Sequence, residues 1–335
     1  MIKSLSSLRF FFAILVFLVH IEVFTVAIGH AFFIVLSGFI LSMVYQTSIL
    51  NQQILPKTFF LKRLVRIYPL HLLTLLLSLP LTIFFFNESH LKWFSALLLN
   101  AFFLQTFVPD INYYFSFNGV SWNAADLMLF YACFPFLIKW LSDFSNKAFT
   151  IVMICIVLFL VILMNFVSEA YHHFLFYISP LRILDFIFGI YLYRIIKYRE
   201  IHVSYKLGSL LEVVALVFLA TWFAILNVYP DLFRPYLYSL LLWLPVGLVI
   251  VTFYFEKGFI SKKILSTPFM SRLGRISFSF YMLHHLVLRY FELINKRNFQ
   301  LQQGLLYYIF CFIVAVIAAY ICNRYFERLF YKFKF

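Results

Sequence analysis

The stretch Leu8-Arg9-Phe10-Phe11-Phe12-Ala13-Ile14-Leu15-Val16-Phe17-Leu18-Val19-His20 places an arginine at the start of a long apolar run and a histidine inside it. Eleven positions correspond to roughly 16 Å along a helix, so we expect Arg9 near one membrane face and His20 near mid-depth. Ionisable side chains at such depth are costly and usually face a cavity or a partner, which makes both residues candidates for function. A helix-end anchor and a hydrogen-bonded core histidine would produce the same pattern.

The composition is that of a membrane protein. Of the 335 residues, 64% are hydrophobic and only 12% are charged, a balance that no soluble globular domain has. Many apolar runs approach the length of about 20 residues that crosses a bilayer as a helix. A β-barrel would instead alternate apolar and polar residues. We therefore predict an all-α fold: a polytopic membrane helix bundle, formed by a single integral membrane domain over residues 1–335 with no appended soluble domain.

The positive charge indicates how the chain is oriented. The net charge of +14 comes mostly from short basic segments between the apolar runs, which is the positive-inside pattern and does not indicate nucleic-acid binding. If all these segments lie in the cytoplasm, the chain must cross the membrane an even number of times between the first basic segment and the second. Five apolar runs lie between them, so one of the five does not span. The run 93–108, which is short and ends at Pro109, is the candidate for a re-entrant or interfacial segment. We expect about ten spans in a bacterial inner membrane, with both termini cytoplasmic. The apolar runs lie at about 8–27, 30–46, 67–86, 93–108, 124–142, 148–168, 178–195, 208–227, 236–255, 276–292 and 304–323.

Two motifs follow the opening stretch. Ser37-Gly38, inside the second run, permits the close approach of another helix. Arg63 and Arg66, three residues apart before the third run, share one helix face, and two guanidiniums on one face can hold phosphates. Ordinary packing and a positive-inside anchor explain the same residues equally simply.

Further ionisable residues lie in or beside later runs. Asp126 opens the apolar helix that follows Trp122 and precedes Tyr131, where a carboxylate suits the positive end of the helix dipole and can also serve only as a cap. Arg182 and Asp185 have the i,i+3 spacing of an ion pair. The run near 276–292 carries His284. No histidine or cysteine pattern matches a metal site, so we expect no metal.

Taken in order, these motifs resemble the membrane-bound acyltransferase type 3 family, which transfers acyl groups, usually acetyl, to sugars of surface glycans. The resemblance covers essentially the whole chain. Its blocks are Arg9 with His20, the FFIVLSGF run over 32–39, Arg63-x-x-Arg66-x-Tyr68-Pro69, the helix from Arg182 to Gly189, the Leu273-Gly274 to His284 block, and the closing Phe326-Glu327-Arg328.

One block departs from the family pattern. The family has an acid five residues after the tryptophan, a position that Leu127 occupies here, whereas the acid of this chain is Asp126. A step of one residue turns a side chain by about 100° on a helix. Either the start of the helix is locally re-registered, or Asp126 does not take the role of the family's acid.

The resemblance implies an integral membrane O-acyltransferase. Acyl-CoA, with acetyl-CoA as the expected form, would be the donor substrate and no cofactor would be permanently bound. The acceptor would be a hydroxyl of a polysaccharide or lipid-linked sugar. His20 would act as general base or acyl carrier, assisted by Arg9 and Asp126, while Arg63 and Arg66 would hold the donor. Further residues expected to bind substrate or support the structure are Ser37, Trp122, Tyr131, Arg182 and His284.

Two other classes also explain buried charges in a helix bundle. A transporter or flippase of a lipid-linked sugar or small anion is the alternative function, although no inverted repeat is visible. A purely structural protein accounts for the bundle but leaves the clustered motifs unexplained.

Overall fold

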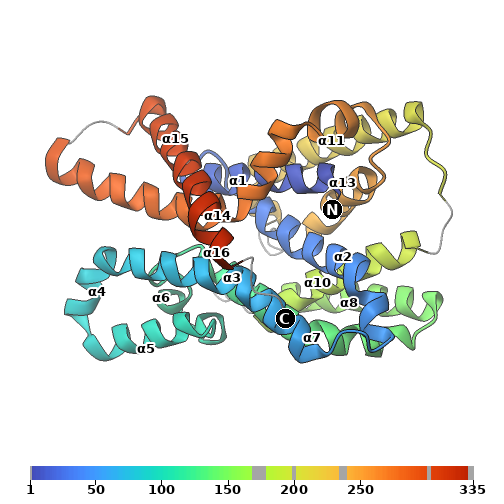
Figure 1. Cartoon of the computed structure of the whole chain (residues 1–335), viewed down its shortest axis with the longest axis horizontal. Helices are drawn as coiled ribbons and strands as arrows, with labels where there is room; N and C mark the ends of the chain where they lie inside the picture. The colour runs from blue at the N-terminus through green and yellow to red at the C-terminus, as the bar shows by residue number, and fades with distance from the viewer. Residues whose placement is uncertain (1, 168–178, 198–200, 234–239, 300–302, 331–335) are drawn as a thin grey trace. The chain divides into compact units, whose positions relative to one another are not determined.

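The computed structural model describes residues 2–167, 179–197, 201–233, 240–299 and 303–330 (Figure 1). Within these ranges every regular element is a helix and there is no strand, which confirms the all-α prediction. The chain divides into two compact units. The first unit comprises residues 1–56 and 130–275, and the second comprises residues 57–129 and 276–335.

The helices of each unit can be followed by colour in Figure 1. The first unit contains α1 (Lys3–His20), α2 (Ile28–Leu50), α8 (Asn146–Phe166), α10 (Ser179–Lys197), α11 (Tyr205–Val228), α12 (Pro230–Phe233), α13 (Leu240–Tyr254) and the π-helix η5 (Ile260–Leu265). The second contains α3 (Pro56–Ser78), η1 (Leu79–Thr82), α4 (Ile83–Glu88), α5 (His90–Ala101), η2 (Gln105–Phe107), α6 (Ile111–Tyr114), η6 (Asn295–Phe299), α15 (Leu305–Ile321), η7 (Cys322–Glu327) and α16 (Arg328–Phe330). The unit boundary falls within α7 (Ser121–Ser142) and within α14 (Pro268–Ile294).

Seven helices among the described residues are long and apolar enough to cross a membrane. They are Lys3–His20, Ile28–Leu50, Pro56–Glu88, Ser121–Ser142, Asn146–Phe166, Tyr205–Val228 and Leu305–Phe330. Leu240–Tyr254 is a shorter apolar helix. The run 93–108 forms no such span: α5 has 12 residues, and a turn and the short helix η2 follow it. The count of about ten spans stays a prediction.

Several helices present apolar side chains outward. On α8, Ile151, Leu158 and Ile162 are each more than half exposed, and α11 and α15 carry similar side chains. Contiguous apolar surface of this kind is unfavourable in water and natural in lipid. The outward faces therefore support the assignment of these helices to a membrane.

Glycine sets the closest helix contact of the first unit. A Cβ atom built on Gly38 of α2 would lie 2.1 Å from the backbone oxygen of Phe186, and one built on Gly189 of α10 would lie 2.0 Å from the backbone oxygen of Val35. Each helix thus packs its backbone directly against the other. The Ser37-Gly38 pair was predicted to permit such an approach, and α10 is the helix that makes it.

We expect Gly189→Ala to lower the stability of the protein by about 3 kcal/mol, at the upper end of what overpacking usually costs, because the new methyl group meets backbone that cannot rotate away. Gly304→Ala is the matched control, since a Cβ at Gly304 has nothing within 4 Å. The midpoint of thermal unfolding in lipid nanodiscs measures both. A Gly189→Ala protein as stable as Gly304→Ala would show that the two helices separate easily.

The N-terminal end of α1 is bonded to residues far along the chain. The Ser4 amide donates to Glu256 Oε1 at 2.8 Å, the Ser4 hydroxyl to the Phe253 carbonyl at 2.7 Å, and the Ser7 hydroxyl to the Leu265 carbonyl at 2.7 Å. The first of these bonds satisfies a backbone amide that a helix start leaves without an intrahelical partner. They also fix α1 against the segment that joins α13 to η5.

A buried carboxylate organises the same segment. Glu212 of α11 is 1% exposed and accepts the backbone amides of Gly258 at 3.0 Å, Ile260 at 2.8 Å and Ser261 at 3.3 Å. Negative charge is favourable at the start of a helix, where amides lack intrahelical acceptors. Glu212 therefore serves as the cap of η5 from a different helix.

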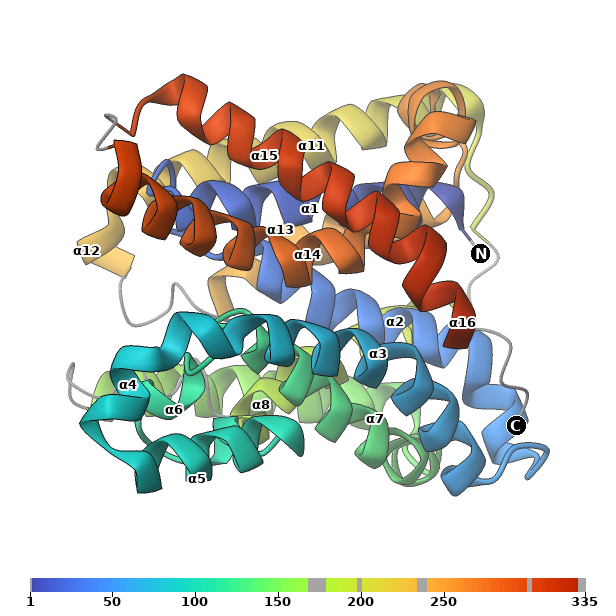
Figure 2. The ribbon, with the colours of Figure 1, turned by 60° about the vertical axis from the view of Figure 1, so that its left-hand side comes forward.

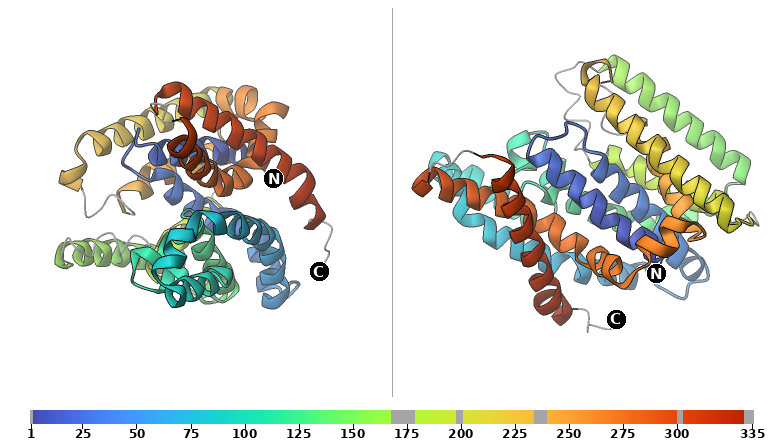
Figure 3. Two further views of the ribbon diagram at one scale, coloured as in Figure 1. Left: turned by 90° about the vertical axis from the view of Figure 1, so that its left-hand side faces the viewer. Right: turned by 90° about the horizontal axis from the view of Figure 1, so that it is seen from above.

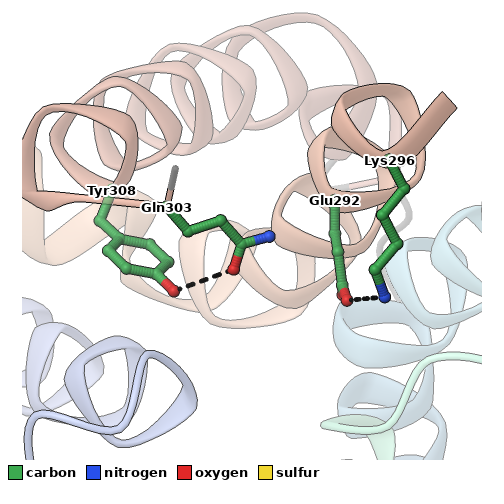
Figure 4. Close-up of polar contacts among 4 residues, drawn as sticks. All are labelled: Glu292, Lys296, Gln303 and Tyr308. Carbon is green, nitrogen blue, oxygen red and sulfur yellow. Dashed lines mark hydrogen bonds and ion pairs between the residues drawn. The ribbon is translucent and has the colours of Figure 1, made fainter. Parts of the chain in front are cut away.

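The second unit is built from two helical hairpins. In one, α5 folds back beneath α3 and α4 (Figure 2), where Leu75, Ala96 and Phe117 form a small buried cluster. In the other, α14 and α15 (orange and red in Figure 3) contact each other through the ring pairs Phe280–Phe312 and Phe291–Phe310. Its connecting end is polar: Lys296 Nζ lies 2.6 Å from Glu292 Oε1, and Tyr308 donates to Gln303 (Figure 4).

Candidate functional site

Arg9 and His20 both lie on α1 in the first unit. The helix begins at Lys3, so Arg9 is in its second turn rather than at its start, and the Arg9 side chain is half-buried. The helix ends at His20, whose side chain is exposed, and a turn follows that includes Glu22 at φ 61°. The predicted run 8–27 is therefore shorter as a helix. A histidine at a helix terminus, with an exposed ring, can be reached by a substrate.

The remaining predicted residues of the first unit are more enclosed. Ser37 is half-buried on α2, and Tyr131 is 8% exposed on α7. Arg182 is 1% exposed and pairs with Asp185 at 2.8 Å, which confirms the ion pair expected from their spacing. Asp185 also accepts a 2.5 Å bond from the Trp243 indole. This pair is fully desolvated. Removing either partner would leave an unpaired charge in the interior, which is strongly destabilising.

The two arginines predicted to bind phosphate lie on α3 in the second unit. Both are inside the helix, because α3 begins at Pro56. Arg66 is exposed, while Arg63 is half-buried with its guanidinium 5.8 Å from the Phe59 ring centroid. Arg66 is therefore positioned to meet an anion directly. The Arg63 guanidinium is held in part by its cation–π interaction with this aromatic ring.

Asp126 does not open its helix. The structure begins α7 at Ser121, and no acidic residue lies in its first turn, so the interpretation of Asp126 as a helix cap is wrong. The helix is continuous from Ser121 to Ser142, so Leu127 is turned by about 100° from Asp126. Asp126 is 0% exposed, and Trp122, one turn earlier on the same face, is 2% exposed.

The electrostatic surroundings of Asp126 include two tyrosines. Burial, together with the negative charges of Asp110 and Asp126, raises the pKa of Tyr114 to about 12. Tyr114 is therefore a neutral hydroxyl at any physiological pH. The Tyr281 hydroxyl also lies within electrostatic reach of Asp126 and donates to the Val120 carbonyl at 2.9 Å.

The loop that precedes α7 is hydrogen-bonded to α14 in both directions. Asn118 donates to the Met282 carbonyl at 2.9 Å, and Arg289 donates to the Phe117 carbonyl at 2.7 Å. Phe117 has a positive φ of 60°, which is costly for an aromatic residue and persists only when the surroundings impose it. Residues 281–289 of α14 thus set where α7 starts, and with it the position of Asp126.

His284 lies within the same part of α14. It is fully buried, and its Nδ1 carries a proton because it donates to the Phe280 carbonyl at 3.1 Å. Before His284, α14 is fixed at Ser279 by Glu327, one of the closing Phe-Glu-Arg residues, which accepts from Ser279 and from Asn323. Glu327 thereby joins α14 to the end of α15.

Four positioning residues found in the structure were not identified from the sequence. They are Asn118, Tyr281, Arg289 and Glu327. Asn118 and Arg289 act on backbone carbonyls more than 160 residues away in the sequence. Such partners leave no local pattern. A polar residue inside an otherwise apolar run was the available signal, since it must find a partner there.

The fold and these residues define a class: a helical membrane protein with ionisable side chains built into its apolar helices. A family model described as an acyltransferase domain matches residues 2–324. The chain therefore belongs to the acyltransferase 3 family and is an acyltransferase, which confirms the resemblance read from the motifs. Acyltransferase MdmB of Streptomyces mycarofaciens is 26% identical over 325 residues, covering 86% of this chain and 79% of the relative. No solved structure matches.

Proposed function

We propose that this acyltransferase moves an acyl group, with acetyl the expected one, from acyl-CoA to a hydroxyl of a cell-surface or lipid-linked polysaccharide sugar. The observation that carries the proposal is His20: an exposed imidazole at the end of an apolar helix, in a chain that belongs to an acyltransferase family. An imidazole is suited to proton transfer near neutral pH.

The proposed reaction needs one base and one anion-stabilising group. The acceptor hydroxyl gives its proton to the His20 imidazole while its oxygen attacks the thioester carbonyl. The C–S bond then breaks, and the CoA thiolate takes up the proton. His20 could equally carry the acyl group in an intermediate step. Arg9, eleven residues earlier on the same helix, would hold the donor or the developing oxyanion.

The donor phosphates would meet the arginines of α3. Arg66 is exposed and Arg63 is its neighbour three residues away, which suits a charge-assisted grip on phosphate. This end of α3 carries the basic segment Lys57, Lys62, Arg63 and Arg66, which we place in the cytoplasm of a bacterial cell, together with both chain termini. The arrangement would admit acyl-CoA from the cytoplasmic side of the inner membrane.

We expect Arg63→Ala and Arg66→Ala to raise the KM for acyl-CoA about tenfold, because each removes a charge-assisted bond worth ~1.5 kcal/mol or more. Membrane insertion should be normal, since the other basic segments keep the orientation. Lys57→Ala, one turn or more earlier on the same helix and exposed, is the control. An unchanged KM for acyl-CoA would return both arginines to the role of membrane anchors.

A membrane assay with radiolabelled acetyl-CoA tests the proposal directly. Label that is recovered on extracted glycan and is released by alkali supports O-acyl transfer. A transporter of a lipid-linked sugar would move its substrate without transferring label. Comparison of surface glycan from deletion and wild-type cells by NMR would then show whether an acetyl methyl signal is lost.

A further inference from the structure

The end of α1, where His20 lies, is closed by two backbone hydrogen bonds. The Val23 amide donates to the Leu18 carbonyl at 2.9 Å, and the Glu22 amide donates to the Val19 carbonyl at 3.1 Å. This pair of bonds is the Schellman motif, which places the residue after the helix cap in the left-handed region. Glu22 occupies that position with φ 61°. Glycine adopts this conformation without cost, whereas a residue with a Cβ keeps it only when its surroundings impose it.

The loop that follows α1 is bonded to the end of α11. The amide and the hydroxyl of Thr25 both donate to Asn227 Oδ1, at 2.8 Å and 3.1 Å. Phe24 packs edge-on against Phe223, with the ring centroids 4.8 Å apart. All of these residues belong to the first unit. Because the contacts begin two residues after Glu22, they supply the surroundings that its left-handed conformation needs.

Asn227 is itself held in place. Its Nδ2 donates to the Phe223 carbonyl at 2.8 Å, which directs Oδ1 toward Thr25. Five residues earlier on α11, the Trp222 indole donates to the Leu241 carbonyl of α13 at 2.9 Å. The end of α11 is therefore a firm support, and Asn227 connects the loop to it.

This support matters because His20 is the last residue of α1. Helix ends fray, so the position of a terminal side chain depends on what holds the turn after it. The opposite end of α1 is fixed by the bonds of Ser4 and Ser7, so a loosened loop would displace the His20 end. A catalytic group misplaced by about 1 Å can lose ~10²-fold in rate even when the cause lies far from the chemistry.

We propose that Asn227 is a positioning residue for His20: through Thr25 it holds the left-handed turn at Glu22 in place and thereby sets where the imidazole stands. This proposal rests on the proposed role of His20 as base or acyl carrier. It requires Asn227 to act on the rate of acyl transfer and not on the binding of acyl-CoA.

The test measures how fast label passes from radiolabelled acetyl-CoA to extracted glycan, in membranes that contain equal amounts of each variant. Asn227→Leu keeps the volume of the side chain but removes both bonds to Thr25. We expect the maximal rate to fall at least ~10-fold, with the KM for acetyl-CoA unchanged. Thr25→Val removes one of the two bonds without touching α11 and should have a smaller effect in the same direction. Thr150→Val, which removes an exposed bond between α8 and α10, is the control and should be fully active.

A second substitution separates positioning from a general loss of stability. Glycine forms the left-handed turn without help, so Glu22→Gly should restore most of the rate to Asn227→Leu. Gln52→Gly is the matched control, because Gln52 has φ 56° in the same motif at the far end of α2, where the Gln53 amide donates to the Ser48 carbonyl at 2.8 Å. It relieves the same strain elsewhere in the unit and should restore nothing.

A wild-type maximal rate in Asn227→Leu, or a loss confined to the KM for acetyl-CoA, would overturn the proposal. So would a Glu22→Gly substitution that restores no more rate than Gln52→Gly does. The same holds if Asn227→Leu slows a His20→Gln protein by the factor by which it slows the wild type, since a residue that acts through His20 has nothing left to position there. A wild-type rate in His20→Gln alone would instead contradict the proposed role of His20.

Discussion

His20→Gln is expected to slow acyl transfer at least ~10²-fold, the contribution that a positioned acid or base typically makes. Glutamine keeps a similar size and hydrogen-bonding ability but cannot accept a proton from a hydroxyl at neutral pH. The side chain is exposed at the end of α1, so the change removes no buried packing. Single-turnover transfer of label from acetyl-CoA, together with acetyl-CoA affinity, measures the effect.

Insertion, thermal stability and acetyl-CoA affinity of His20→Gln should match the wild type. His202→Gln, at an exposed histidine before α11, is the control and should be fully active. Transfer by His20→Gln at a rate near that of the wild type would exclude His20 as base or acyl carrier. His284, whose ring is held with Nδ1 protonated, would then be the next candidate.

Asp126→Asn is expected to remove most of the activity, by about two orders of magnitude, because it removes the carboxylate that the resemblance assigns to the family's acidic position. The substitution keeps the shape of the side chain and abolishes only the charge. Because Asp126 lies beyond the first turn of α7, loss of a helix cap cannot account for such a fall. Initial rates in nanodiscs, normalised to folded protein, measure it.

Asp143→Asn, at an exposed aspartate just after α7, should leave the rate unchanged. The double change Asp126→Ala with Leu127→Glu moves the acid to the family's position. On a continuous helix that position faces about 100° away, so we expect no recovery of activity. A double variant as active as the wild type would show that α7 can shift its register, and that Asp126 has no special place.

The helical, membrane-spanning fold could be predicted because length and apolarity alone determine which segments cross a bilayer. The ion pair of Arg182 with Asp185 was also predictable, since it lies within one turn. Ser37-Gly38 indicated a close helix contact, but not that Gly189, in a distant span, would complete it. Local periodicity carries no information on which helix is the partner.

Charges were the least predictable part. Arg194 belongs to one of the short basic segments between the apolar runs. Its guanidinium nevertheless donates to the Leu141 carbonyl at 2.6 Å and to Asn146 Oδ1 at 2.8 Å, closing the end of α7. Asp126 was predicted to open its helix because a carboxylate suits the positive end of the helix dipole. The helix instead begins at Ser121, and its first residues are buried although two of them, Ser121 and Asn123, are polar.

The bonds at the start of α1 bear on the order in which the protein is made. Ser4 and Ser7 are synthesised first, but their acceptors at Phe253, Glu256 and Leu265 follow about 250 residues later. At ~5–20 residues per second, a ribosome needs roughly 12–50 s to supply them. During that interval α1 waits in the bilayer with the start of its helix unsecured. A chain released before residue 265 would keep its first helix but lack the groups that fix it, and we expect such a fragment to be degraded rapidly.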